Sequence, residues 1–363
     1  MSVLAAIAVL ALLIVVHELG HFLAARLQGI HVNRFSIGFG PILLKYQGPE
    51  TEYALRAFPL GGFVGFPDDD PDSKFADDDP DLLRNRPVLD RVIVVSAGVI
   101  ANLIFAYFVL ALQIGGAGIP EGFDYQPGVA IPQVVSLDSP AAQGGLKSGD
   151  IVLAIDGEPL PAAEGSMLKL KETIEQHPDR PLKFQIDRQG SISTLTVTPK
   201  SDSDGKGRIG VQLAPNGDPI YRRPRNTFEI FSLASERFQD IFLGTVNGFY
   251  RLVTNFGDTA SQLGGPVKIV EQGAKVAESD ALNLLAFAAI ISINLAIINI
   301  LPLPALDGGQ LVFLIVEGLR GKPIPVHIQD GVMQSGLLIL LGLGMFLIVR
   351  DTVNLEWVQQ LNR

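Results

Sequence analysis

Two histidines and a glutamate near the amino end have the types and the spacing of a catalytic zinc site. His17 and His21 are four positions apart, and Glu18 follows the first of them. Side chains four apart lie one above the other on a helix, so both imidazoles can bind one metal ion. Glu18 is then placed to act as general base toward a water molecule at the metal. The pattern predicts hydrolysis that depends on Zn²⁺, with one ion per chain.

The segment that carries these residues is otherwise apolar. No charge occurs from residue 3 to residue 16, and residues 22–25 continue the apolar run. A helix of about 20 apolar residues spans a bilayer, and an ionisable side chain within it is costly unless it has a partner or a function. A buried cluster of structural hydrogen bonds is the alternative to a metal site. The segment lacks a basic leader region and a small-residue cleavage site, so we expect a retained membrane helix over residues 3–27.

The composition fits several membrane spans joined to a soluble portion. Of 363 residues, 47% are hydrophobic and only 18% are charged. The net charge of −10 argues against nucleic acid as a partner. The absence of cysteine excludes disulfides and thiolate ligands, so a metal must take nitrogen and oxygen donors.

Three further apolar runs predict membrane helices. They cover residues 92–114, 282–303 and 332–349. In the first of them Gly98 and Asn102 share one helix face, which favours close helix packing with Asn102 hydrogen-bonding across it. Four spans place both termini on one side, and basic residues mark the opposite side as cytoplasmic. The basic residues are Arg84, Arg86, Arg91, Arg320 and Lys322.

Short alternating runs between residues 32 and 66 predict β-strands near the membrane. Within them, residues 59–65 are glycine-rich and apolar. This stretch is either a tight turn or an edge strand that offers backbone groups of Gly61, Gly62 and Phe63 to an extended peptide. The acidic stretch over residues 68–81 is predicted to be a solvated loop, since it lacks the glycine and the final glutamate of a calcium loop.

Residues 120–215 have the composition of a soluble α+β domain. The sequence SPAAQGGLKSGDIVLAIDG at 139–157 resembles the circularly permuted PDZ domains of bacterial membrane-associated proteases. The resemblance implies a groove that binds an extended peptide or a carboxyl terminus by strand addition. A spacer domain without peptide affinity is the alternative. After it, residues 226–280 mix aromatic and charged side chains, which indicates amphipathic helices on the membrane surface or helices packed against the soluble domain.

The third apolar run ends in a broken helix beside a carboxylate. Pro302 and Pro304 interrupt the helix, which frees backbone groups at membrane depth. Such irregular backbone is tolerated only where protein or a polar cavity surrounds it. Asp307 follows directly, and it is the best candidate for the third metal ligand beside His17 and His21.

These motifs together resemble the site-2 protease family of intramembrane zinc metalloproteases. The resemblance is carried by HELGH in the first span, by Gly98 and Asn102 in the second and by NILPLPALDGG in the third, although Val99 stands where the family often has proline. It implies His17, His21 and Asp307 as ligands and Glu18 as catalytic base. It also implies that Asn299 lines the substrate cleft and that residues 58–64 form a membrane-inserted loop.

The resulting prediction is a multi-pass α-helical membrane protein with about four transmembrane helices, membrane-associated β-strands and an inserted PDZ-like α+β domain. The first predicted domain, 1–116, holds the first two spans and the strands at about 32–66, and the second, 120–215, is the PDZ-like domain. Residues 226–280 hold the amphipathic helices, and residues 281–363 hold the last two spans. The location is the bacterial inner membrane, with the active site near the cytoplasmic face and the PDZ-like domain on the periplasmic side.

The predicted substrate is a transmembrane helix of a single-span protein that another protease has already cut, such as an anti-sigma factor or a remnant signal peptide. Such a helix must unwind before cleavage, and Asn102 or Asn299 would then hydrogen-bond the opened chain. The alternatives are a non-catalytic peptide-binding scaffold with a structural metal and a metal-ion transporter. The absence of ionisable residues from the fourth span argues against the transporter.

Overall fold

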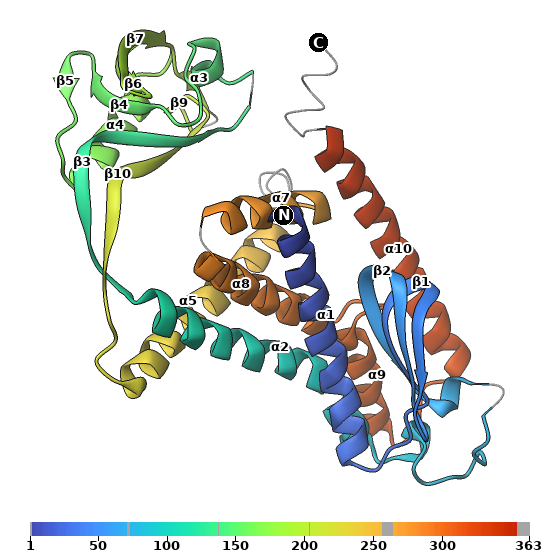
Figure 1. Cartoon of the computed structure of the whole chain (residues 1–363). Coiled ribbons are helices and arrows are strands. Elements are labelled where there is room, and N and C mark those ends of the chain that lie inside the picture. The colour runs from blue at the N-terminus through green and yellow to red at the C-terminus, as the bar shows by residue number, and fades with distance from the viewer. Residues whose placement is uncertain are drawn as a thin grey trace. The chain divides into compact units, whose positions relative to one another are not determined.

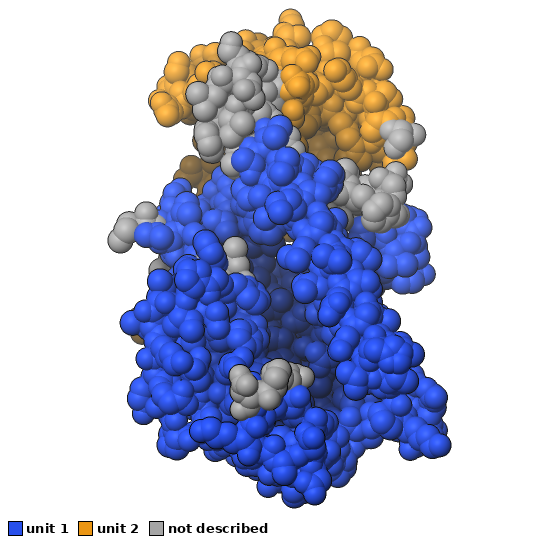
Figure 2. Space-filling view, turned by 90° about the vertical axis from the view of Figure 1, so that its right-hand side faces the viewer, with its two compact units in different colours: residues 1–117, 224–363 blue, residues 118–223 orange. Residues whose placement is uncertain are grey.

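The computed structural model describes residues 2–70, 73–136, 138–202, 204–255, 264–279 and 281–353. The chain divides into two compact units (Figure 1). Unit 1 comprises residues 1–117 and 224–363, and unit 2 comprises residues 118–223. Because the chain of unit 1 continues on both sides of unit 2, unit 2 is an insertion in that chain. Seen from the side shown in Figure 2, the surface of unit 1 is hollowed along its middle.

Four helices among the described residues are long and apolar enough to cross a membrane. They are α1 (Ser2–Leu27), α2 (Val88–Ala117), α8 (Ala281–Ile300) and α10 (Val326–Val353). The four predicted spans are thereby confirmed as helices. Helix α8 ends at Ile300, earlier than the apolar run, because the residue before Pro302 is disfavoured in helical conformation.

Helix α2 is the centre of unit 1 and packs against α1, α8 and α5 (Thr227–Thr254). Its contact with α8 is lined by small residues, among them Ala106 and Ala289, which lets the two backbones approach closely. Helix α5 adds Ala234 to this core and leaves Phe228 exposed. The stretch predicted as amphipathic thus packs one face on the membrane helices.

The predicted strands near the membrane form β1 (Arg34–Gln47) and β2 (Glu52–Gly65), which both reverse direction partway. Residues 34–37 pair with residues 52–55 in parallel and with residues 62–65 in the antiparallel direction. Residues 42–47 pair with residues 52–56 in the antiparallel direction. Gly40 and Gly61 lie at the reversals with φ of +85° and +112°, which glycine adopts without strain. Residues 62–65 are therefore a strand at the edge of this small sheet, and the chain reverses at Gly61 just before this strand.

Unit 2 is a small α+β domain around one apolar core. Its main sheet has the order β10-β3-β4-β6-β7, with β5 beside β4. Fully buried side chains such as Phe184, Leu170 and Ile131 fill the core. The elements are β3 (Ile119–Val134), α3 (Pro140–Gln143), β4 (Ile151–Ile155), β5 (Glu158–Pro159), α4 (Gly165–Glu175), β6 (Leu182–Arg188), β7 (Ser191–Val197), β8 (Lys200–Ser201), β9 (Gly207–Arg208) and β10 (Val211–Arg222). Helices and strands thus alternate in unit 2, as expected of the α+β domain predicted for residues 120–215.

A buried carboxylate ties two strands of unit 2 together. Asp150 is 1% exposed and accepts two hydrogen bonds of 2.7 Å from Arg188 and one of 2.8 Å from the Lys147 amide. Burial alone would raise the pKa of Asp150, but these hydrogen bonds outweigh it and hold the pKa below its usual range. The ion pair therefore stabilises unit 2 at pH values above the usual carboxyl pKa and is lost as the pH falls through the lowered one.

We expect Asp150→Asn to destabilise unit 2 by about 1–3 kcal/mol at neutral pH, because the charge-assisted hydrogen bonds are lost. Hydrogen exchange of the unit 2 amides in the full chain measures this, with Glu172→Gln on the exposed face of α4 as control. The difference between variant and wild type should shrink as the pH falls into the acidic range. A difference independent of pH would contradict the role of the ionised carboxylate.

Candidate metal centre

The two histidines of α1 point to the same side of the helix. His17 Nε2 and His21 Nε2 are 3.3 Å apart, and the two rings stand at 89° to each other. His17 is 8% exposed. The spacing of four residues brings the two nitrogens together, as the sequence predicts.

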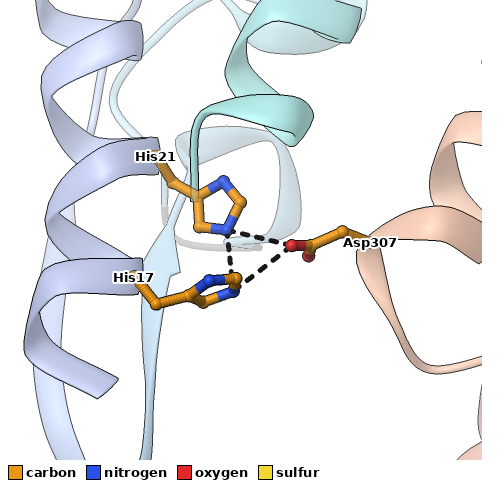
Figure 3. A group of neighbouring side chains, drawn as sticks. All are labelled: His17, His21 and Asp307. Carbon is orange, nitrogen blue, oxygen red and sulfur yellow. Dashed lines mark hydrogen bonds and ion pairs between the residues drawn. The ribbon is translucent and has the colours of Figure 1, made fainter. Parts of the chain in front are cut away.

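Asp307 faces this pair from the first turn of α9 (Asp307–Arg320), as Figure 3 shows. Its Oδ2 atom lies 3.2 Å from His17 Nε2 and 3.5 Å from His21 Nε2. Gly308 and Gly309 follow it, and a Cβ at either position would overlap carbonyl oxygens of the loop after α8. The Asp-Gly-Gly sequence thus lets α9 begin directly against that loop and aim the carboxylate at α1.

The three atoms have the spacing that a tetrahedral zinc ion requires. Zinc bonds to nitrogen and oxygen of about 2.0–2.1 Å place neighbouring ligand atoms about 3.3–3.4 Å apart. The observed separations are 3.2, 3.3 and 3.5 Å. In addition, Asp307 Oδ2 is buried and accepts no hydrogen bond from the residues that the structure describes. A buried carboxylate oxygen without a donor is the state expected of a metal ligand, so the donor set fits one zinc ion with a fourth position open.

Both histidines are held by groups on α2 behind them. His21 donates from Nδ1 to the Val94 carbonyl oxygen at 2.8 Å, which leaves Nε2 free for a metal. His17 Nδ1 lies 3.4 Å from the Asn102 amide, and Asn102 is fully buried. The Asn102 backbone carbonyl accepts a hydrogen bond of 2.9 Å from Ser292 on α8. Asn102 therefore contacts the edge of the His17 ring at Nδ1, away from the candidate ligand atom Nε2.

Gly98 provides the space that the two imidazoles occupy. A Cβ at this position would lie 2.7 Å from His21 Cε1 and 2.8 Å from His17 Cε1, and closer still to His21 Nε2. A Cβ on Gly20 of α1 would likewise overlap the Ala97 carbonyl oxygen on α2. Gly98, predicted from the sequence to serve helix packing, thus lies directly beside the candidate ligands.

We expect Gly98→Ala to lower zinc affinity by about 10- to 100-fold, the range seen for groups that orient metal ligands. The added methyl group would displace both imidazoles. Titration with a competing chelator measures the affinity, and Gly115→Ala is the matched control on α2, since a Cβ there makes an ordinary 3.5 Å contact with Ile230. Equal affinities for the two variants would show that Gly98 does not shape the site.

The other residues predicted to act in the site lie at its rim. A Cβ on Gly62 would come within 2.8 Å of Glu18 Cγ, so the edge of β2 passes directly beside the candidate base. The Asn299 amide lies 3.2 Å from His17 Nε2, on the side of the candidate ligand atoms. Phe63 stacks under the Arg56 guanidinium at 5.5 Å, and a Cβ on Gly61 would overlap the Phe39 ring.

A cluster of His31 with three acidic residues follows α1, and the sequence did not predict it because its members are far apart in the chain. His31 Nδ1 bonds to Glu50 at 2.7 Å and its Nε2 lies 3.8 Å from Asp79, while Asp81 is paired with Arg86 at 3.1 Å. Burial alone would raise the pKa of Glu50, but hydrogen bonds from His31 and a neighbouring arginine hold it below its usual range. The cluster is therefore an ion-pair network that ties the loop after α1 to the acidic loop before α2.

The sequence of the chain matches a known protein family and several of its members. The profile of peptidase family M50 matches residues 5–343. A Nostoc protein whose name gives it as a candidate zinc metalloprotease is 58% identical over 99% of this chain and 100% of its own length. "Membrane metalloprotease ARASP, chloroplastic" of Arabidopsis thaliana is 49% identical over 99% of this chain and 80% of its own length. "Regulator of sigma-E protease RseP" of Salmonella typhimurium is 29% identical over 93% and 96%.

Among solved structures, the PDZ domain of the SdrC-like protein of Listeria monocytogenes matches 26% of this chain and 94% of its own, with 21% identity and a TM-score of 0.21. The four spans form a multi-pass integral membrane protein with an α+β domain inserted between its second span and its later ones. The family predicted from the motifs is thus confirmed. The chain belongs to peptidase family M50, the site-2 proteases, and is an intramembrane zinc metalloprotease.

Proposed function

We propose that this protease cleaves transmembrane segments of single-span membrane proteins, with His17, His21 and Asp307 holding one Zn²⁺ and Glu18 as general base. The observation that carries the proposal is the convergence of Asp307 Oδ2 with the two histidine nitrogens, within a unit whose helices span a membrane. A relative named as a regulator of sigma-E protease supports an anti-sigma factor as one class of substrate. Remnant signal peptides are the other class.

The residues of the site divide the chemistry between them. Held by His17, His21 and Asp307, a zinc ion would supply polarisation of the scissile carbonyl and a lowered pKa of water. Glu18 takes the proton of the attacking water and passes it to the leaving amine. The Asn102 side chain is fully buried beside His17 Nδ1, and its packing there keeps the His17 ring oriented. This role fits its burial better than the substrate contact expected from the sequence.

The edge of β2 is the proposed binding surface for the unwound substrate. A helical segment hides its peptide bonds in its own hydrogen bonds, so it must open before cleavage. Residues 62–65 pair with β1 along one side only, among the described residues. An extended chain added to the free side by strand pairing would pass Glu18, since Gly62 contacts its side chain. Gly61 and Phe63 flank this position, and the Asn299 amide would hydrogen-bond the opened chain from α8.

We further propose that the protein lies in a bacterial plasma membrane with the active site toward the cytoplasm. Arg84 and Arg86 precede α2, and Arg91 lies in its first turn, so all three lie at the end of α2 that is farther along the chain from unit 2. The positive-inside rule then places that end in the cytoplasm and the PDZ-like domain on the other side. There the domain binds a peptide or a new carboxyl terminus, or limits the size of substrates that another protease has cut.

Metal removal and restoration test the proposed function. We expect the purified protein to cleave single-span peptides in detergent or liposomes, to lose activity when a chelator removes its zinc and to regain it with about one zinc per chain. Elemental analysis of the same samples gives the zinc content. Cleavage by the zinc-free protein would contradict the proposal. Stable peptide binding without turnover by the zinc-loaded protein would favour the scaffold instead.

A further inference from the structure

Helix α10 makes few contacts with the rest of unit 1. Of its residues only Gly336 and Asp351 are buried. Asp351, near its end, accepts a hydrogen bond of 3.3 Å from the Lys268 amide in the first turn of α7 (Pro266–Ser279). Gly336, about four turns earlier along the helix, lies against the loop between α8 and α9. The helix is therefore anchored at two separate points.

At the earlier point the backbone of α10 rests on Pro304. A Cβ at position 336 would lie 2.7 Å from the carbonyl carbon and oxygen of Pro304, and would overlap its ring. Carbon atoms normally approach to about 3.5–4.0 Å, so only glycine fits there. One turn away, Met333 Sδ accepts a hydrogen bond of 3.3 Å from the backbone amide of Ala305.

The loop under this contact is strained and leads directly to a proposed ligand. Ala305 has a φ of +69°, in the left-handed region that residues other than glycine rarely adopt. Such a conformation persists only where the surroundings hold it. Asp307 follows two residues later, and Leu306 caps α9 without a side-chain hydrogen bond. The contacts from α10 therefore hold the loop before Asp307 in addition to hydrogen bonds within the loop, such as that from the Leu306 amide to the Leu303 carbonyl.

We infer that α10 positions the carboxylate of Asp307, with Gly336 and Met333 as positioning residues. Gly336 sets the distance between α10 and Pro304, and Met333 holds the strained amide of Ala305. Together they keep the start of α9 at the depth where Asp307 reaches the histidines of α1. This inference rests on the proposal that Asp307 is a zinc ligand.

Zinc release to a chelator tests the inference on the full-length protein in detergent. We expect Gly336→Ala to release zinc about 10- to 100-fold faster than wild type, because displaced ligands lose affinity by that range. Gly342→Ala is the matched control on the same helix, since no atom of the described part of the chain lies within 4 Å of a Cβ there. Cleavage by Gly336→Ala should recover in excess zinc, which a merely unfolded variant would not do.

A second variant keeps the test decisive if Gly336→Ala fails to fold. Met333→Ala removes the sulfur acceptor without adding atoms, and we expect it also to speed zinc release while Gly342→Ala does not. Wild-type release rates in the folded variants would overturn the inference. Two failures can be told apart. If Asp307→Ala retains zinc like wild type, the ligand assignment is wrong, whereas loss of zinc in Asp307→Ala alone overturns only the positioning role.

Discussion

Replacing Glu18 with glutamine is expected to abolish cleavage and to leave zinc in place. The amide keeps the size and hydrogen-bonding shape of the carboxylate but cannot take a proton from water. General base catalysis contributes about 10²- to 10⁴-fold to a rate, so the loss should be at least of that order. Because Glu18 is not among the three converging ligand atoms, the metal content should not change.

Two measurements on one protein sample check this result. Elemental analysis should give equal zinc in wild type and Glu18→Gln, while cleavage of a single-span peptide falls to background. Glu271→Gln on α7 is the matched control, since Glu271 forms an i,i+4 pair with Lys275 at the surface. Near-normal cleavage by Glu18→Gln would require another base, and loss of zinc would make Glu18 a ligand.

Replacing Asp307 with alanine is expected to remove both zinc and activity. The change deletes one of three protein ligands and leaves two histidines, which hold zinc far more weakly than a complete set. The expected loss of affinity exceeds the roughly 10- to 100-fold typical of residues that only orient ligands. Asp307→Ala should therefore lose more zinc than Gly98→Ala or Gly336→Ala.

The control for this variant must separate metal loss from misfolding. Asp330→Ala removes an exposed carboxylate from α10 and should retain full zinc content. Hydrogen exchange in unit 2 should be the same in all variants, because unit 2 has a core of its own. Normal zinc content in Asp307→Ala would mean that the third ligand is another group.

The spans and the candidate ligands could be predicted because each depends on local sequence. An uncharged run of sufficient length fixes a membrane helix whatever surrounds it. The spacing of His17 and His21 fixes their common face. Asp307 could be singled out because prolines break the helix before it. A carboxylate beside broken backbone at membrane depth must be surrounded by protein or a polar cavity, which makes a functional role the expected one.

What the sequence did not predict depends on contacts between distant segments. The reversals within β1 and β2 follow from pairing partners that alternation alone cannot choose. Gly98 and Gly336 each have an ordinary local setting in an apolar helix, and only the assembled unit shows that a methyl group would meet an imidazole or Pro304. Likewise the contact of Asn102 with His17 could not be distinguished from substrate contact, because both need a polar amide on that face.

The two long strands that begin and end unit 2 lie side by side. Ile119 pairs with Arg222 in antiparallel register, so the chain comes back to within about 5 Å of where it left. A hairpin of about two residues is enough to close such a gap. The insertion is therefore an exchangeable cassette: a different module with adjacent ends can be grafted at this point, and the reach of the enzyme toward its substrates can change without redesign of its catalytic helices.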